Sequence, residues 1–271
     1  MPELPEVETT RRGIAPLLSG RRVTSVVIRE ARLRWPIPQA LARDLPGQLV
    51  NGVTRRAKFL LVESPVGHLI LHLGMSGSLR VVPQDLPPEK HDHLDVVMDD
   101  GRCLRLRDPR RFGAALWTTD DPLDHPLLRH LGPEPLEDDF NAERLHQHSR
   151  GRRVAVKSFL MNSRVVVGVG NIYASESLYL AGIHPKRPAG RISLMRYAGL
   201  VEAVREVLKG AIAAGGTTLR DFVDSDGKPG YFSQKLRVYG RQNEACEQCG
   251  EPIRNRVIGQ RSTYYCHCCQ R

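Results

Sequence analysis

The sequence lacks any apolar run long enough to cross a bilayer. A membrane helix needs about 20 mostly apolar residues, and the 271 residues contain no such stretch. The acidic start of the chain also lacks the apolar segment of a secretory signal peptide. Cysteine is scarce outside the tail, since five of the six cysteines lie at or after position 246 and only Cys103 lies elsewhere. Because a disulfide framework distributes its cysteines along the chain, we expect a cytoplasmic protein without disulfides.

Acidic side chains are outnumbered by basic ones. There are 40 Lys and Arg residues against 30 Asp and Glu residues, a formal net charge of +10, and the pI is about 9.6. An excess of this size serves solubility in some proteins. Combined with cysteines spaced as metal ligands, the excess of positive charge indicates a positively charged surface that binds nucleic acid. The length allows two modest domains, each with its own core.

The cysteine-rich tail contains two CxxC pairs separated by sixteen residues. This spacing is typical of four thiolates around one structural Zn²⁺ ion. A redox CxxC, the alternative, usually occurs once and near a βαβ unit. Cys268 is an additional thiol to which we assign no role. Between the pairs, Arg254, Arg256 and Arg261 predict a basic hairpin that can lie on phosphates. The predicted zinc ligands are Cys246, Cys249, Cys266 and Cys269.

The hydrophobic pattern changes period near the middle of the chain. After a helix predicted at 5–18 and ended by Gly20, short strands with turns and no intervening helices predict an antiparallel β-sandwich. The strands are expected at 23–28, 58–62 and 68–73, with a hairpin over 96–106 that turns at 99–101. The second half predicts helices at 174–180 and at 194–211, the latter with Leu194, Tyr197, Val201, Val204, Leu208 and Ala211 on one face. We therefore expect an α+β protein with a β-sandwich domain at 1–132, a linker at 133–150, a helical domain at 151–235 and a zinc-binding hairpin at 236–271.

The first eight residues, Met-Pro-Glu-Leu-Pro-Glu-Val-Glu, place a proline directly after the initiator methionine. Methionine is normally removed before so small a residue, which would expose the secondary amine of Pro2. A free α-amino group titrates near ~7.7–8.0, and such an amine can form a Schiff base with Glu3 beside it to move protons. The residues alone favour a simpler interpretation, an ordinary helix start with Pro5 and two acids in the first turn. If Met1 is retained, the Pro2 nitrogen is an amide and the Schiff base is impossible.

This octapeptide resembles the N-terminal signature of the bacterial formamidopyrimidine-DNA glycosylases, which excise oxidised purines. The resemblance implies that Pro2 is the nucleophile and Glu3 the acid/base. A second match covers residues 157–177, where Gly-Val-Gly-Asn-Ile-Tyr-Ala at 168–174 is similar to the helix–two-turn–helix motif of that family. Glycines before a helix let backbone N–H groups approach a phosphate, although such a turn by itself merely connects helices in many proteins. The resemblance extends over nearly the whole chain, from residue 2 to residue 269.

The same resemblance implies roles for further residues. Lys58 would assist the β-elimination that cleaves the abasic strand, and Arg261 the δ-elimination that follows it. The alternative for Lys58 is a lysine at a strand edge whose ammonium group simply extends to solvent. The implied DNA contacts are His91, Arg110, Arg152, Lys157, Asn171 and Tyr239. A wedge of Met75, Arg110 and Phe112 would fill the space that an extruded nucleotide leaves, the alternatives being a core methionine and a solvated turn. The loop implied to cover the lesion contains Thr217, Thr218, Leu219, Arg220, Asp221 and Phe222.

The function implied is that of a bifunctional DNA glycosylase and lyase. It would remove 8-oxoguanine and formamidopyrimidines through a Schiff base at Pro2 and cleave the abasic strand by β,δ-elimination. Its partners would be one structural Zn²⁺ and double-stranded DNA, with no membrane, and we expect a monomer. Two alternatives remain: an endonuclease VIII-like enzyme for oxidised pyrimidines, whose signature has glycine at the position of Leu4, and a zinc-ribbon DNA-binding protein without catalysis. The sequence departs from the family pattern at two places. Ala245 stands where a proline usually precedes the first zinc cysteine, and His267-Cys268 stands where a proline-containing pair is usual.

Overall fold

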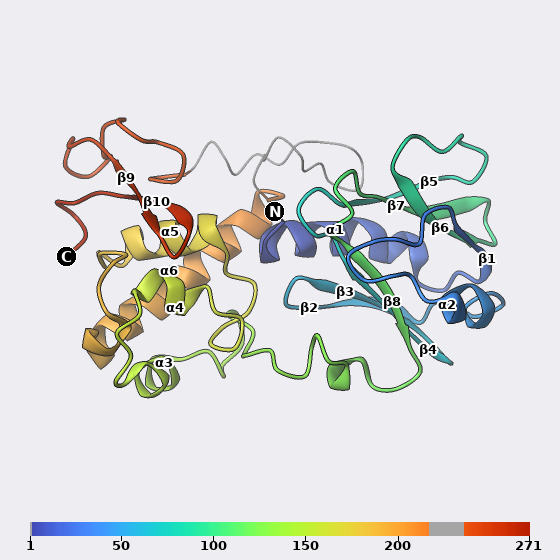
Figure 1. Cartoon of the computed structure of the whole chain (residues 1–271), viewed down its shortest axis with the longest axis horizontal. Coiled ribbons are helices and arrows are strands. Elements are labelled where there is room, and N and C mark those ends of the chain that lie inside the picture. The colour runs from blue at the N-terminus through green and yellow to red at the C-terminus, as the bar shows by residue number, and fades with distance from the viewer. Residues whose placement is uncertain (1, 217–235) are drawn as a thin grey trace. The chain divides into compact units, whose positions relative to one another are not determined.

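The computed structural model describes residues 2–216 and 236–271, so the predicted lesion-covering residues 217–222 lie outside the described residues. The described chain forms two compact units: unit 1 contains residues 2–130 and 214–216, and unit 2 contains residues 131–213 and 236–271. Figure 1 labels the α-helices and strands. The elements of each unit, with the two short 3-10 helices η1 and η2, are as follows. In unit 1 these are α1 (Leu4–Leu18), β1 (Val23–Ile28), α2 (Gln39–Asp44), β2 (Gly52–Arg56), β3 (Phe59–Ser64), β4 (Gly67–His72), β5 (Ser78–Pro83), β6 (Asp92–Met98), β7 (Arg102–Arg107), β8 (Ala114–Thr118) and η1 (Pro122–Asp124). In unit 2 they are α3 (Ala142–Ser149), α4 (Val156–Leu160), α5 (Asn171–Leu180), η2 (Ala189–Arg191), α6 (Leu194–Ala213), β9 (Arg254–Ile258) and β10 (Arg261–Tyr265).

Unit 1 is an antiparallel β-sandwich, which confirms the predicted fold. One sheet has the strand order β1-β6-β7-β5 and the other β2-β3-β4-β8. The predicted hairpin is present, with Val96 opposite Leu104. The strand predicted from residue 58 begins one residue later. Lys58 lies instead with Ala57, at φ 56°, in the two-residue turn between β2 and β3.

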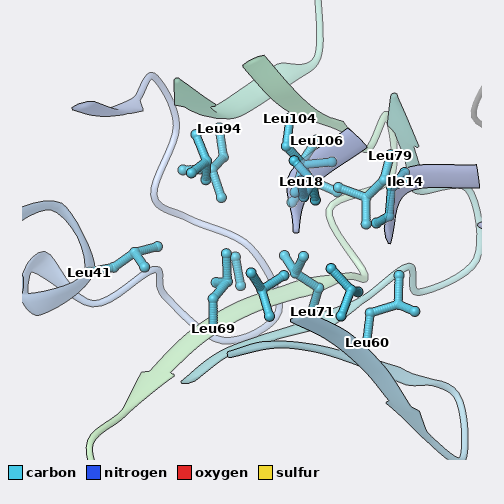
Figure 2. Packing of buried hydrophobic residues seen from close by; sticks show 14 of the residues in the cluster. Ile14, Leu18, Leu41, Leu60, Leu69, Leu71, Leu79, Leu94, Leu104 and Leu106 are labelled. Carbon is cyan, nitrogen blue, oxygen red and sulfur yellow. The ribbon is translucent and has the colours of Figure 1, made fainter. Parts of the chain in front are cut away.

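The core of unit 1 lies between the two sheets and takes one face of α1 (Figure 2). Helix α1 agrees with the predicted 5–18 and ends before Gly20, which has φ 78°. Burying a leucine or isoleucine stabilises a fold by about 1.5–3 kcal/mol, so this cluster anchors α1 to the core between the sheets. The labelled members are Ile14 and Leu18 from α1, Leu41 from α2, Leu60, Leu69 and Leu71 from one sheet, and Leu79, Leu94, Leu104 and Leu106 from the other.

Unit 2 consists of helices with a β-hairpin near the end of the chain. Helix α6 buries the predicted face except at Leu194, which is 42% exposed because it is the first residue of the helix. Helix α5 begins at Asn171, three residues earlier than predicted. The segment expected to be a linker contains α3, which is capped by the Asn141 side chain and packs on α6. None of the helices in the described part of the chain is long and apolar enough to span a membrane.

Candidate functional site

The start of α1 holds the two residues predicted to carry the chemistry. Pro2 is buried and Glu3, the N-cap of the helix, is 3% exposed. The backbone N–H of Glu3 donates to Oε2 of Glu6 at 2.8 Å, and the Glu3 side chain accepts in return from the Glu6 backbone in a capping box. The predicted helix start is therefore confirmed, and it places the Glu3 carboxylate at the positive end of the helix dipole.

Gly216, the last described residue before position 217, packs on this capping box. It has φ +84°, and a Cβ built on it would lie 3.3 Å from both Cγ and Oε1 of Glu6. A larger residue would therefore be strained in its backbone and crowded against Glu6. The chain enters the predicted lesion-covering segment directly beside the residue that fixes Glu3.

Two loops of unit 1, at residues 74–77 and 108–113, are joined by the carboxylate of Asp108. This residue is fully buried. Its Oδ1 accepts from the Ser76 hydroxyl at 2.9 Å and from the Arg110 amide at 3.3 Å, and its Oδ2 accepts from the Gly113 amide at 2.7 Å. Its carbonyl oxygen lies 2.8 Å from Nε2 of His93. A buried charge held by several donors fixes the conformation of the segment around it, so Asp108 sets the shape of both loops.

These loops bring together the backbones that carry the three predicted wedge residues. Phe112 is 42% exposed, and the guanidinium carbon of Arg110 lies 4.9 Å from the centre of its ring. Met75 lies in the turn that follows Gly74, at φ 61°. A Cβ on Gly74 would lie 2.4 Å from the backbone of Phe112, so only glycine allows the close approach. The exposed Phe112 ring, with the Arg110 guanidinium over it, therefore lies on a loop whose backbone is held by Asp108 and packs closely on Gly74.

Lys58 lies near His72, which the sequence analysis did not single out. Burial, and then the positive charges of Lys58 and Arg34, lower the pKa of His72 to about 4, so its imidazole is neutral near pH 7. Its Nδ1 accepts from the Gly74 amide at 3.0 Å, and its ring lies 4.7 Å from that of Phe59. His72 thus connects the Lys58 turn to the turn that carries Met75. Only the strand pairing of Phe59 with His72 reveals this, and no local motif signals it.

His91 lies in the turn directly before β6 with a left-handed backbone, at φ 79°, and is half-buried. Reduced hydration, and then the positive charges of Lys90, His93, Arg107 and Arg111, lower its pKa. An imidazole surrounded by cations marks a positive surface, which suits a phosphate.

In unit 2, Lys157 joins the helix–two-turn–helix segment to the hairpin. Its Nζ donates to Asn171 Oδ1 at 2.6 Å, to Thr263 Oγ1 at 2.7 Å and to the Ser262 carbonyl at 3.1 Å. Lys157 is only 1% exposed. The direct DNA contact of Lys157 stays a prediction, and in this structure its ammonium group is enclosed by oxygens of its own chain.

Asn171, in contrast, remains half-buried at the start of α5, after a turn in which Gly168 has φ 77°. Its Nδ2 donates to the Ser262 carbonyl at 3.0 Å and lies 3.5 Å from the Tyr239 hydroxyl. The Tyr239 ring packs on that of Tyr264 at 5.1 Å. Asn171 and Tyr239, two of the predicted DNA contacts, therefore lie side by side.

The backbone before the hairpin is held by Glu176 of α5, a residue that sequence reasoning missed. Its carboxylate accepts from the amides of Arg237, Val238 and Tyr239 at 2.8–3.0 Å. Burial raises the pKa of Glu176, and the three amides oppose that effect. The signal in the sequence is weak, because an acid inside a helix is usually solvated.

Arg152 borders a groove of about 440 Å³ within unit 2, lined by Gly151, Arg152, Arg153, Pro188, Gly190 and Arg191. Its guanidinium carbon lies 5.6 Å from the centre of the Phe159 ring. Three arginines on one groove create a local positive potential that suits an anion.

The four predicted zinc ligands meet in the tail of unit 2. Their sulfur atoms lie within 4.8 Å of one another, with Cys246 3.8 Å from Cys269 and Cys249 3.4 Å from Cys266. Four thiolates bound tetrahedrally at about 2.3 Å from one ion are about 3.8 Å apart, so the donor set fits a single metal ion. Arg261 is exposed at the start of β10, beside the turn formed by Gly259 and Gln260.

Tyr179 of α5, also missed from the sequence, lies beneath this cluster. Its hydroxyl oxygen is 3.2 Å from Sγ of Cys246, and the residue is 1% exposed. Burial, and then the contact with Cys246, raise the pKa of Tyr179 and keep its hydroxyl protonated. Burial opposes ionisation of Cys246, but the hydrogen bonds from Tyr179 and from the Gln248 and Cys249 amides lower its pKa to about 6.

Comparison with known proteins agrees with this geometry. The family model described as the formamidopyrimidine-DNA glycosylase N-terminal domain matches residues 1–115, and the one described as the H2TH domain of the same glycosylase matches residues 131–223. Curated relatives named formamidopyrimidine-DNA glycosylase from Syntrophotalea carbinolica and Alkalilimnicola ehrlichii are 61% and 62% identical, each match covering 100% of both chains.

Solved structures of the same kind are similar throughout. The MutM (Fpg) protein of Thermus thermophilus is 39% identical with a TM-score of 0.89, covering 99% of this chain and 98% of that one. A Lactococcus lactis Fpg bound to DNA that contains N7-benzyl-Fapy-dG is 34% identical with a TM-score of 0.92, covering 100% of each chain. Matches of this length and identity identify a shared family over the entire sequence. The chain belongs to the formamidopyrimidine-DNA glycosylase family.

Proposed function

We propose that this chain excises 8-oxoguanine and formamidopyrimidines from duplex DNA and then cleaves the abasic strand by β,δ-elimination. The full-length relatives are named for the glycosylase activity, and similar Lactococcus lactis structures contain Fapy-dG or abasic-site DNA. The observation that carries the proposal is the buried Pro2–Glu3 pair at the N-terminus of α1.

The chemistry begins at the Pro2 nitrogen after Met1 is removed. This secondary amine attacks C1′ of the damaged nucleotide, Glu3 exchanges protons with the reacting atoms, and the base departs. The resulting iminium ion acidifies the 2′ proton and permits β-elimination, which Lys58 assists. For the δ-elimination, Arg261 holds a phosphate or a water molecule, because a guanidinium group is a poor proton donor.

Duplex binding precedes these steps. Asn171, Tyr239, Arg152 and His91 contact phosphates, while Lys157 acts indirectly by holding Asn171 and β10. Met75 and Phe112 fill the space of the extruded nucleotide, and Arg110 pairs with the base left opposite. Extrusion costs a few kcal/mol of stacking, and the exposed Phe112 ring recovers part of that cost. Residues 217–222 cover the extruded base.

Cys246, Cys249, Cys266 and Cys269 hold one Zn²⁺ ion as a closed structural site. The ion supplies folding energy to the hairpin and takes no part in the reaction. The basic hairpin that it supports, with Arg254 and Arg256 on β9, lies against the DNA backbone. The chain acts as a monomer on one duplex, in the bacterial cytoplasm where that duplex lies.

Borohydride trapping tests the proposal. The purified protein is incubated with a duplex that contains 8-oxoguanine, reduced with borohydride, and digested to locate the adduct by mass spectrometry. We expect a covalent adduct on Pro2 in a chain whose intact mass lacks Met1. An adduct on Lys58, or none from active protein, would overturn the assignment of Pro2.

A matched control blocks the nucleophile without altering the rest of the chain. One additional glycine inserted before Pro2 turns its nitrogen into an amide. We expect this variant to keep its circular dichroism spectrum and its binding to undamaged duplex but to lose the adduct on Pro2. Glu3→Gln should retain the amine and lose base excision, since the amide cannot move a proton.

A further inference from the structure

Beside the four-cysteine cluster, the tail brings together a second set of metal-ligating side chains that the zinc motif does not use. A carboxylate oxygen of Glu251, an imidazole nitrogen of His267 and the sulfur of Cys268 lie within 4.8 Å of one another. The three residues combine the donor types that divalent zinc accepts in proteins. Glu251 and Cys268 are exposed and His267 is half-buried, so an ion in solution can reach them.

The distances suit coordination. Sγ of Cys268 lies 3.5 Å from Nε2 of His267. In a tetrahedral site with Zn–S of about 2.3 Å and Zn–N of about 2.0–2.1 Å, sulfur and nitrogen are separated by about 3.5 Å. The two side chains therefore already have the spacing that one shared ion requires.

The imidazole has no competing role within the described residues. Apart from the Cys268 contact, its Nδ1 is buried and has no hydrogen-bond partner. No acceptor in the described part of the chain fixes the orientation of the His267 ring through Nδ1, so the ring can adjust its position toward a bound ion.

The backbone around these residues is fixed by the two CxxC turns. The Glu251 carbonyl accepts from the Cys246 amide at 2.8 Å, and Ala245 pairs with Pro252 in an isolated bridge. His267 and Cys268 lie between the ligands Cys266 and Cys269, in the second turn. Because four thiolates around one divalent ion leave a net negative charge, the neighbouring cluster also favours a second cation electrostatically.

We propose that Glu251, His267 and Cys268 form a second, open metal site for a borderline divalent cation such as Zn²⁺, completed by water in the fourth position. It differs from the closed four-cysteine site in having three protein ligands and an accessible face. Its capacity is one ion per chain, in addition to the ion in the four-cysteine cluster.

The test uses full-length protein loaded with one equivalent of Zn²⁺. Zinc has a filled d shell and is spectroscopically silent, and it competes well with Co²⁺ for thiolates. Co²⁺ is then titrated while sulfur-to-cobalt charge-transfer absorption is recorded, and total metal is measured after desalting. We expect one further equivalent of Co²⁺ with a charge-transfer band, giving two metal ions per chain.

The variants are Cys268→Ser, His267→Gln and Glu251→Gln. Cys268→Ser should abolish the charge-transfer band. Loss of a residue that only hydrogen-bonds to a metal ligand typically weakens metal binding about 10–100-fold, so each variant should weaken binding of the second ion by at least about tenfold. All should keep the first zinc equivalent, which shows that the hairpin remains folded. Cys103→Ser is the matched control, since Cys103 is a thiol in unit 1, and it should keep both ions.

Two results would overturn the proposal. One is a wild-type chain that binds a single ion in total. The other is a charge-transfer band that persists in Cys268→Ser, which would mean that cobalt replaces zinc in the four-cysteine cluster. Neither outcome bears on Pro2 trapping, so this proposal and the glycosylase mechanism fail or succeed separately.

Discussion

The hydroxyl oxygen of Tyr179 lies 3.2 Å from the sulfur of Cys246, so helix α5 supplies a hydrogen bond to one of the four clustered thiolates. The raised pKa of Tyr179 and the pKa of about 6 for Cys246 make the tyrosine the donor and the sulfur the acceptor. The bond links α5, which begins at the predicted DNA contact Asn171, to the predicted zinc-binding tail. Tyr179 itself is not a predicted metal ligand.

Tyr179→Phe should therefore accelerate zinc loss. Partners that hydrogen-bond to metal ligands typically contribute about 10–100-fold to affinity, so we expect release to a chromophoric chelator to be at least about tenfold faster. Tyr197→Phe is the matched control, because Tyr197 is equally buried in unit 2 and donates to the Ala189 carbonyl instead. Each variant should lose about 1 kcal/mol of stability from one hydrogen bond. Equal release rates in the two variants would contradict the prediction.

The carboxylate of Asp108 leads to a prediction about the two wedge-bearing loops. In Asp108→Asn, one carboxylate oxygen is replaced by an N–H₂ group, which cannot accept a hydrogen bond. Either the Gly113 amide or the Ser76 hydroxyl and Arg110 amide then lose their buried acceptor. Such a loss costs about 1–3 kcal/mol. We expect lower stability in urea unfolding and reduced extrusion of a fluorescent base analogue. Asp99→Asn, at an exposed turn of the same unit, should change neither measurement.

Much of the fold could be predicted because its signals are local. The period-two strands, the 99–101 turn and the helix that ends before Gly20 each depend on residues close in sequence, and all are confirmed. The helix predicted at 194–211 does begin at Leu194, but this residue is exposed, because periodicity does not show whether a neighbouring element covers the first residue of a helix. The sequence predicts a strand from Lys58, because the two-residue turn with Ala57 at φ 56° contains no glycine to mark it.

The site was less predictable because its contacts join distant segments. Lys157 is enclosed by Thr263, 106 residues later, and no pattern around position 157 indicates that partner. Asp108 reaches Ser76 across 32 residues, and Tyr179 reaches Cys246 across 67. The four clustered cysteines were predictable, since their CxxC spacing is itself the geometric signal.

The lowered pKa of His72 predicts a pH dependence of stability. The folded protein protonates this ring near pH 4, and the unfolded chain near pH 6.5. Between these values the unfolded state binds more protons, so the stability that His72 contributes is present above pH 6.5 and is lost as pH falls toward 4. Protonation at Nδ1 would also remove the acceptor for the Gly74 amide.

His72→Asn checks this by keeping an acceptor near Gly74 without a titrating group. Urea unfolding from pH 7 to pH 4 should show a smaller loss of stability for the variant than for the wild type. The comparison cancels the acid sensitivity of the other groups. An NMR titration of the His72 ring should give a midpoint near 4, and a midpoint near 6.5 would refute the burial argument.

Substitutions of Arg152 and of Lys157 should have different effects on the salt dependence of DNA binding. A phosphate contact contributes about one unit to the slope of log K against log salt, through release of a counterion. Arg152 borders an open arginine-lined groove, so Arg152→Gln should weaken binding and reduce the slope by about 1. Lys157→Gln should also weaken binding, because Asn171 and β10 lose their shared anchor, but the slope should stay unchanged since the buried ammonium releases no counterion. Fluorescence anisotropy with an abasic-site analogue between about 50 and 200 mM salt measures both slopes. A slope reduced in Lys157→Gln would mean that this ammonium turns outward to the DNA on binding, and Lys157 would then be a direct phosphate contact after all.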